Sequence, residues 1–322
     1  MTRRFLYLFI LLQVLFYACS KDIDQPEHGG NDQQTGEMEP LTFATYNVLK
    51  PEGRRTEMSM HNSTVHKTLG KAIIETKADF IAFNELDETL LKGGEFSIPS
   101  VCNTLKDYDW NIAWPNDIKS DGSIKYSYAN GFAYNKKKLK VEECGYVWLS
   151  KTENEWYVKP SSAYEKVGSP ERTCIWIRMT HIASKTQFWV FVTHLPTSKQ
   201  GGARNMAYVV NNFAKSKAGD QPSILLGDMN SAPGSDGYRM LCRYWRDGNA
   251  NTWGTMSGSS TSYYYPVDEY TDGNTSSRID HIMTRGCTAT DYRLIKTTYK
   301  GSDGNYWCPS DHLPVVATIT IE

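Results

Sequence analysis

The sequence predicts a mixed α/β protein, a large β-sandwich with helices on its outer faces. Short runs of β-branched and aromatic residues are interleaved with helical periodicities in a mixed order, which such a sandwich accounts for best. The 322 residues are 40% apolar and 22% charged, which is ordinary globular usage and excludes a disordered, collagen-like or coiled-coil chain. Seven cysteines are too few for a disulfide scaffold at this length, so a hydrophobic core must carry the fold.

The expected elements follow one another in order from residue 41 to residue 322, with no second domain boundary. Short strands at 41–49 and 79–84 flank a helix. The apolar face of this helix is formed by Val65, Leu69, Ala72, Ile73 and Thr76. Four strands in an antiparallel-looking succession come next, at 129–135, 141–149, 172–182 and 187–195. A second helix then presents Met206, Val209, Val210, Phe213 and Ala214. The last strands are expected at 223–226, 278–284, 291–299 and 315–321.

The N-terminus is typical of an export signal. Arg3 and Arg4 precede an apolar run over residues 5–18, which is shorter than the roughly 20 residues of a membrane-spanning helix. The run ends at Cys19 in a pattern that resembles a bacterial lipobox, with Phe16 where Leu is usual. Residues 19–40 are poor in apolar side chains and indicate a flexible tether. We therefore expect a signal peptide at 1–18 and an outer-membrane lipoprotein anchored through Cys19; an ordinary secretory signal is the alternative.

The charge balance limits the choice of partner. Lys and Arg number 35 against 36 Asp and Glu, so no general positive charge holds a polyanion. Lys136, Lys137 and Lys138 form the one dense basic cluster, which is either a phosphate contact or a solvated turn. Long polar stretches at 150–171 and 243–277 indicate binding loops. The second is rich in Trp and Tyr, which either stack on a substrate or pack the loop down. The cysteines beyond the tether show no metal-ligand spacing and are expected to be mostly buried, with room for one or two disulfides.

Polar side chains stand where several apolar strands end or begin, and this pattern predicts one lined pocket. These residues are Asn47, Glu85, His194, Asp228, Asn230, Asp280, Asp311 and His312. The set contains carboxylates, amides and imidazoles, with no serine or cysteine beside a base. It suits a hard cation with oxygen ligands and phosphoryl chemistry better than zinc or acyl transfer.

Short motifs in a fixed order carry a resemblance to a known family. They are Thr45-Tyr46-Asn47-Val48, Asn84-Glu85, Asn130-Gly131, Arg172, Thr193-His194-Leu195, Gly227-Asp228-Met229-Asn230, Arg278-Ile279-Asp280-His281-Ile282 and Ser310-Asp311-His312-Leu313-Pro314-Val315. In this order the chain resembles the endonuclease/exonuclease/phosphatase superfamily over residues 41–322, with Asn84 where the family usually has Gln. The resemblance implies a four-layer α/β/β/α sandwich of the DNase I-like kind, with the site at one end.

The resemblance also implies roles on the metal side of the site. Glu85 is the expected direct ligand of a Mg²⁺ ion, for which Mn²⁺ or Ca²⁺ is the alternative. Asn47 and Asp311 help to hold the ion, partly through water.

The resemblance also implies roles in proton transfer and phosphate binding. Asp280 orients His312, which either takes a proton from the attacking water or, as imidazolium, stabilises the phosphate. Asp228 is the rival general base, oriented with Asn230. The expected donors to the phosphate oxygens are His194, Asn230 and Arg172.

We therefore expect a metal-dependent phosphoester hydrolase that uses in-line attack of water, and a phosphodiesterase or nuclease-like enzyme in particular. A phosphomonoesterase on a sugar, inositol or lipid phosphate is an alternative, and a catalytically silent surface-binding protein is another. Nucleic acid, a nucleotide, a phospholipid head group and a sugar phosphate all remain open as substrates. The protein is expected to be a monomer.

Overall fold

The computed structural model describes residues 39–49, 63–86, 90, 94–113, 117–118, 124–125, 129–150, 155–157, 172–197, 200–248, 278–302, 304 and 306–322. The expected signal peptide, with nearly all of the tether and Cys19, lies outside the described residues. Most of the two long polar stretches also lies outside them, including the aromatic residues Trp253, Tyr263, Tyr264, Tyr265 and Tyr270.

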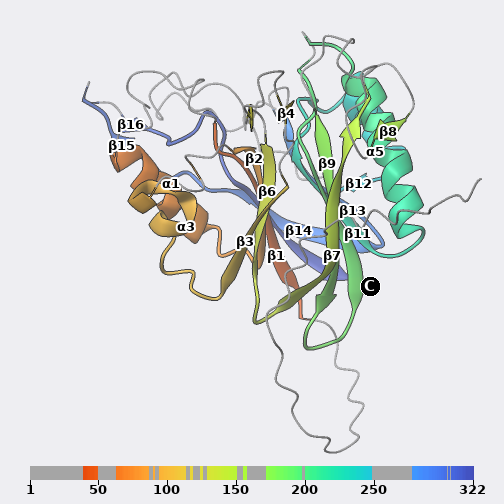
Figure 1. Cartoon of the computed structure of the whole chain (residues 1–322), viewed down its shortest axis with the longest axis horizontal. Helices are drawn as coiled ribbons and strands as arrows, with labels where there is room; N and C mark the ends of the chain where they lie inside the picture. The colour runs from red at the N-terminus through yellow and green to blue at the C-terminus, as the bar shows by residue number, and fades with distance from the viewer. Residues whose placement is uncertain are drawn as a thin grey trace, which may run out of the picture. The chain divides into compact units, whose positions relative to one another are not determined.

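Two mixed β-sheets form the centre of the described chain (Figure 1). The first sheet has the order β14-β17-β1-β2-β6-β3, with β1 (Leu41–Asn47), β2 (Phe80–Leu86), β3 (Tyr108–Ala113), β6 (Ala129–Asn135), β14 (Cys287–Leu294) and β17 (Val315–Ile321). The second has the order β12-β13-β11-β10-β9-β7-β8, with β7 (Leu139–Leu149), β8 (Trp156–Tyr157), β9 (Thr173–His181), β10 (Gln187–Thr193), β11 (Ser223–Asp228), β12 (Arg246–Asp247) and β13 (Asp280–Arg285). Two small hairpins pair β4 (Asp117–Ile118) with β5 (Ile124–Lys125) and β15 (Tyr299–Lys300) with β16 (Tyr306–Trp307).

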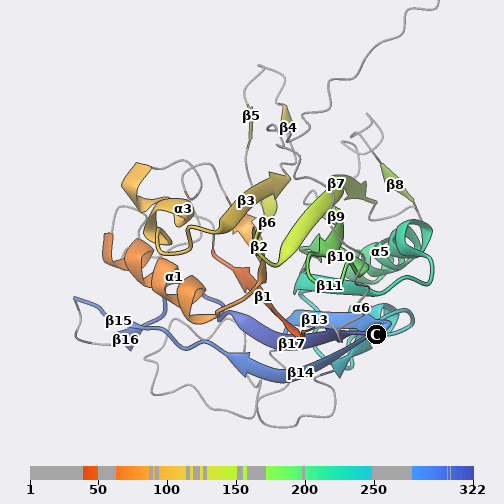
Figure 2. The same ribbon diagram turned by 90° about the horizontal axis from the view of Figure 1, so that it is seen from below.

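The helices cover the outer faces of the sheets, so four layers result (Figures 1 and 2). The described helices are α1 (Ser63–Glu75), α3 (Ile98–Val101), α5 (Ala203–Ala218) and α6 (Asp236–Leu241), with a 3-10 turn η3 at Gly94–Phe96. Both α1 and α3 pack on the first sheet, while α5 and α6 pack on the second. The predicted α/β/β/α sandwich is confirmed.

Strand periodicity explains why each sheet is apolar on both faces. In β1, Phe43 packs in the cluster between the sheets, whereas Ala44 and Tyr46 pack against α1. The Phe43 ring lies 5.4 Å from that of Phe80 in the same sheet and 6.2 Å from that of Phe188 in the other. Apolar side chains on both sides hold the two sheets and the helices in one rigid frame.

Two features of the fold differ from the sequence prediction. The four central strands are not one antiparallel succession: β6 pairs with β2 and β3 in the first sheet, whereas β7, β9 and β10 are neighbours in the second. Strands apolar on both faces suit either sheet, so their sequence does not specify which one they join. The strand expected at 291–299 is β14, which begins four residues earlier, directly after Gly286 at φ 62°.

The cysteines follow the prediction of buried apolar side chains in most cases. Cys102, Cys174, Cys287 and Cys308 are buried, whereas Cys144 and Cys242 are exposed. Burial raises the pKa of the Cys102 and Cys308 thiols to about 12. No disulfide bond joins the cysteines in the described part of the chain.

In the described part of the chain, no helix combines the length and the apolar character that a membrane crossing requires.

Candidate active site

All the predicted site residues lie at one end of the two sheets. The parallel strands β1 and β2 end there, as do the parallel strands β10 and β11. Strands β6, β9, β13 and β17 are antiparallel to these and therefore begin at the same end. The first sheet and its connections contribute Asn47, Glu85, Asp311 and His312, and the second contributes Arg172, His194, Asp228, Asn230 and Asp280. The site is thus shared between the two sheets.

Two of these residues have backbone conformations that favour glycine. Glu85 has φ 57° and Asn230 has φ 45°. At Glu85 the pairing of β2 with β6 shifts between Phe83 and Leu86, so a bulge re-aims the carboxylate at the strand end. Asparagine tolerates this region better than most residues, whereas glutamate does not. Such conformations persist where the surrounding structure fixes them, which is common at functional sites.

Asp228 accepts hydrogen bonds from three sides. Its Oδ1 accepts from the Asn230 backbone N–H at 2.8 Å, and its Oδ2 accepts from Asn47 Nδ2 at 3.1 Å. The same Oδ2 lies 3.3 Å from His194 Nε2. Although burial opposes ionisation, His194, His312 and the Asn230 N–H together lower the pKa of Asp228 far below its usual range. Asp228 is therefore a buried, ionised carboxylate.

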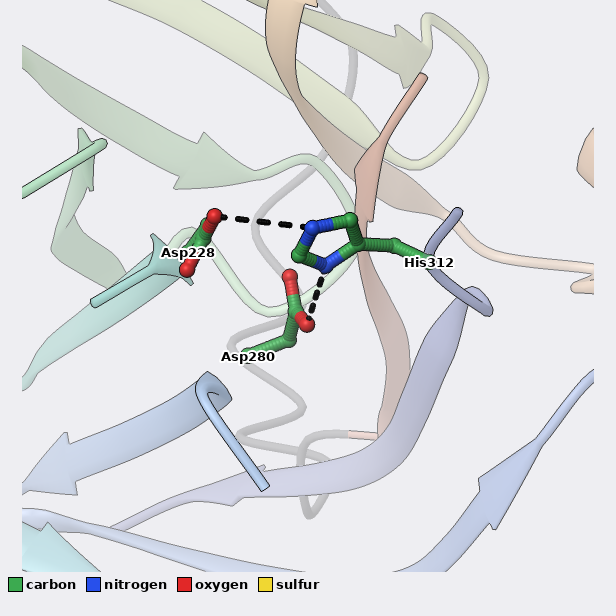
Figure 3. A group of neighbouring side chains, drawn as sticks. All are labelled: Asp228, Asp280 and His312. Carbon is green, nitrogen blue, oxygen red and sulfur yellow. Dashed lines mark hydrogen bonds and ion pairs between the residues drawn. The ribbon is translucent and has the colours of Figure 1, made fainter. Parts of the chain in front are cut away.

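His312 lies between two carboxylates (Figure 3). Its Nδ1 is 2.7 Å from Asp280 Oδ2, and its Nε2 is 3.8 Å from Asp228 Oδ2. Burial alone would lower the pKa of His312, but the charges of Asp280 and Asp228 outweigh it and hold this pKa well above 6.5. Burial and the charge of Asp228 also raise the pKa of Asp280. The Asp280–His312 pair therefore retains a proton in this setting.

A set of hydrogen-bond donors surrounds His194, next to Asp228. Asn230 Nδ2 is 3.0 Å from His194 Nε2 and donates to the Leu195 carbonyl at 2.8 Å. The buried Arg172 guanidinium donates from Nη2 to Gln200 Oε1 at 3.3 Å. Burial, and then the charge of Arg172, lower the pKa of His194. These groups place one full positive charge and several N–H donors beside the carboxylates, which is what developing negative charge on a phosphate requires.

Oxygen donors on the first-sheet side fit a hard divalent cation. Asn47 Nδ2 donates to Glu85 Oε1 at 3.3 Å, which places the amide and the carboxylate side by side. Asp311 Oδ1 is buried and has no hydrogen-bond partner among the described residues. Burial, together with the charges of Glu85 and Asp228, raises the pKa of Asp311. Closely spaced carboxylates of this kind are stabilised by a cation with oxygen ligands.

A second set of donor atoms also lies close together. Asp228, Asp280 and His312 offer ligand atoms that all lie within 4.8 Å of one another. Coordination through His312 Nδ1 would break its 2.7 Å contact with Asp280. A cation on the Asn47, Glu85 and Asp311 side, the set expected from the sequence, leaves this contact intact.

Several residues of the site were not among those predicted. Ser310 Oγ donates to the Asn47 carbonyl at 2.7 Å and accepts from the His312 N–H at 3.2 Å. Gln200 holds Arg172, as described above. Asn84 and Asn130 are buried amides directly beneath the charged residues. Two signals pointed to these asparagines: each is a polar residue inside an apolar strand, and each stands in one of the motifs that carry the family resemblance.

A two-sheet α/β sandwich with carboxylates, amides and imidazoles gathered at one end is a fold of the DNase I-like class. Residues 44–312 match the Endonuclease/Exonuclease/phosphatase family, and the chain belongs to this family. None of the curated proteins compared with the sequence matches it.

Solved structures share the fold over most of the chain. An endonuclease/exonuclease/phosphatase family protein from Bacteroides thetaiotaomicron has a TM-score of 0.69 at 20% identity, covering 88% of this chain and 100% of its own. A mannosyl-6-phosphatase from the same species also has a TM-score of 0.69 at 20% identity, covering 87% and 99%. TDP2 from D. rerio, complexed with single strand DNA product, has a TM-score of 0.57 at 17% identity, covering 88% and 99%. At these identities the likeness establishes the fold alone.

Proposed function

We propose that this protein is a divalent-metal-dependent phosphoester hydrolase. One observation carries the proposal: the proton-holding Asp280–His312 pair faces the ionised Asp228 at 3.8 Å, beside the carboxylates of Glu85 and Asp311 and the amide of Asn47. Proton transfer, charge stabilisation and cation binding are thus available in one place.

The charges and contacts of the site residues indicate a separate role for each in the reaction. Glu85, Asn47 and Asp311 would hold Mg²⁺ or Mn²⁺, which when bound withdraws charge from the phosphate oxygens. Asp228 is a weak base, because three donors already lower its pKa; it orients Asn47, Asn230 and His194. His312 at Nε2 is the group that transfers a proton, since Asp280 fixes its other nitrogen.

The phosphate itself would be held from the second sheet. Arg172, Asn230 and His194 would donate hydrogen bonds to its oxygens. Because no serine or cysteine is placed as a nucleophile among the predicted site residues, water attacks phosphorus directly and no covalent intermediate forms.

The expected substrate is a phosphodiester, and a sugar phosphate monoester is the second candidate. The position and pairing of the basic cluster favour the monoester. Its three lysines form ion pairs with acidic side chains: Lys136 with Asp109, Lys137 with Asp107 and Lys138 with Asp79. This cluster lies at the end of β6 that is away from the site, so it does not form a binding surface for a nucleic-acid backbone next to the site. The buried Arg172 instead provides one cation for one phosphate group. The fold shared with a mannosyl-6-phosphatase supports this candidate, and the fold shared with TDP2 complexed with single strand DNA product supports the diester.

Hydrolysis by the purified protein tests the proposal. We expect bis-p-nitrophenyl phosphate to be cleaved with Mg²⁺ or Mn²⁺ and EDTA to abolish the activity, with recovery when the metal is restored in excess. A panel of plasmid DNA, RNA, sphingomyelin, inositol phosphates, nucleotides and mannose 6-phosphate then separates diester from monoester substrates. Undiminished cleavage in EDTA, or no cleavage of any of these compounds with either metal, would contradict the proposal.

We also propose that the protein is exported and anchored in the outer membrane through a lipid on Cys19. The basic start, the short apolar run over residues 5–18 and the polar residues that follow support this. In a Gram-negative host, Cys19→Ala should move the protein from the membrane fraction to the soluble fraction and remove its labelling by radioactive palmitate. Labelling that persists in Cys19→Ala would show that the anchor is elsewhere.

A further inference from the structure

A layer of neutral amides lies directly beneath the charged residues of the site. Asn84 Nδ2 donates to Asn130 Oδ1 at 2.7 Å, and both side chains are almost completely buried. Asn84 stands where the family usually has Gln, and neither asparagine has a role in the proposed mechanism. We call this pair the amide bridge.

The amide bridge joins the two sheets. Asn84 and Asn130 belong to the first sheet, on β2 and β6. Asn84 Oδ1 accepts from the Asp228 N–H at 2.8 Å, and its Nδ2 also donates to the Thr193 carbonyl at 3.2 Å. Asn130 Nδ2 donates to both Oγ1 and the carbonyl of Thr173 at 3.1 Å. The amide bridge thus contacts β9, β10 and β11 of the second sheet, on the very strands that end or begin at the site.

The backbone at Gly227 allows the close contact between Asn84 and the Asp228 N–H. Gly227, just before Asp228, has φ 143°, and a Cβ there would lie 1.8 Å from the Thr193 carbonyl oxygen and 3.3 Å from Asn84 Oδ1. Only glycine lets β10 and β11 come this close beneath the amide. The Asp228 backbone therefore sits against Asn84 with no side chain between them.

The amide bridge differs from the other contacts across the site in its charge. Asn47 Nδ2 to Asp228 and His312 Nδ1 to Asp280 also join the sheets, at 3.1 and 2.7 Å. Those contacts involve ionised groups, whose charges change when a cation binds or a proton moves. All donors and acceptors of the amide bridge are neutral amides, carbonyls and a hydroxyl, so their hydrogen bonds do not depend on either event.

We propose that Asn84 and Asn130 are positioning residues that hold the two halves of the site at a fixed separation in every charge state. The inference rests on the proposed function, because the halves it aligns are the cation side and the proton-transfer side. Catalytic groups displaced by about 1 Å can lose roughly 100-fold in rate, so even a small shift of Asp228 relative to Glu85 matters.

The test uses Asn84→Ala and Asn130→Ala, singly and together, in the full chain. The matched control is Asn211→Ala, which also removes a buried amide: Asn211 Nδ2 donates to the Met240 carbonyl at 2.6 Å, between α5 and α6. For each variant we measure Tm, kcat and KM with bis-p-nitrophenyl phosphate, and the Mn²⁺ concentration that gives half of the metal-induced rise in Tm. The Tm measurement reports cation binding without any reaction.

We expect Asn84→Ala to lower kcat at least about tenfold, at a temperature where all variants are folded, and to raise the Mn²⁺ concentration at least about threefold. The double variant should lose no more than about twice what the worse single variant loses, because the two side chains act through one contact. Asn211→Ala should lower Tm and leave kcat and the Mn²⁺ response unchanged. A fall in Tm alone, with kcat and the Mn²⁺ response of Asn84→Ala within about twofold of the parent, would reduce the amide bridge to a stabilising role and overturn the inference.

The outcomes separate this inference from the proposed function. If the parent binds Mn²⁺ but cleaves no phosphoester, the proposed hydrolase is wrong, while the Mn²⁺ response of the variants still decides the positioning role. If Asn84→Ala does not fold, Asn130→Ala carries the test with the same readouts, since it leaves the contact between Asn84 and the Asp228 N–H in place.

Discussion

Replacing His312 with alanine is expected to lower kcat/KM at least about 100-fold, because it removes the group that transfers the proton. The imidazole is held at one nitrogen by Asp280 at 2.7 Å, so its other nitrogen is presented to the site in a single orientation. Asp228, which faces the same nitrogen, does not replace it, since its pKa is strongly lowered and it is ionised. The measurement is steady-state hydrolysis of bis-p-nitrophenyl phosphate at saturating Mg²⁺.

The control for this variant is His181→Ala. His181 is also a buried histidine, and its Nδ1 lies 2.8 Å from Ser184 Oγ. It is the last residue of β9, whereas Arg172 precedes the first, so it lies at the end of the sheet that is away from the site. We expect full activity in His181→Ala. Activity of His312→Ala within about tenfold of the parent would remove His312 from the mechanism.

Much of the site could be predicted because strand periodicity marks it. Asn47, Asp228 and Asp280 stand at the ends of apolar strands, where a polar side chain has no place in the core. Since parallel strands end together and antiparallel strands begin there, local positions in the sequence imply one shared location. The outer helices were predictable for a similar reason: the five residues expected on the apolar face of α5 are all buried.

The sequence could not predict contacts that depend on which strands pair and on which sheets face each other. Asn84 lies among apolar residues, but its partners Asn130, Thr193 and Asp228 come from three other strands whose sheet order was not known. The sequence predicts one antiparallel-looking succession for the four central strands and assigns no sheet to β6, so the contact of Asn130 with β9 across the sheets could not be inferred. The bulge at Glu85 depends on the pairing with β6 and leaves no mark in the local sequence.

Asp228→Asn is expected to lower kcat at least about 100-fold, although the new side chain has nearly the same shape. Three donors converge on this carboxylate: Asn47 Nδ2, the Asn230 N–H and His194 Nε2. An amide has an NH₂ group in place of one acceptor oxygen, so at least one of these donors would face another donor instead of an acceptor. It also removes the buried negative charge that faces His312. Steady-state kinetics of the purified variant, with its Tm measured alongside, checks this expectation.

Asp79→Asn separates this effect from the general cost of removing a buried carboxylate. Asp79 is also buried, accepts from the Thr42 N–H at 3.0 Å and pairs with Lys138 at 3.2 Å. It directly precedes β2, at the end away from Glu85, so its loss should lower Tm and leave kcat unchanged. If Asp228→Asn keeps its activity while its Tm falls as in Asp79→Asn, then Asp228 stabilises the fold only. The orientation of Asn47, Asn230 and His194 would then have to come from other contacts.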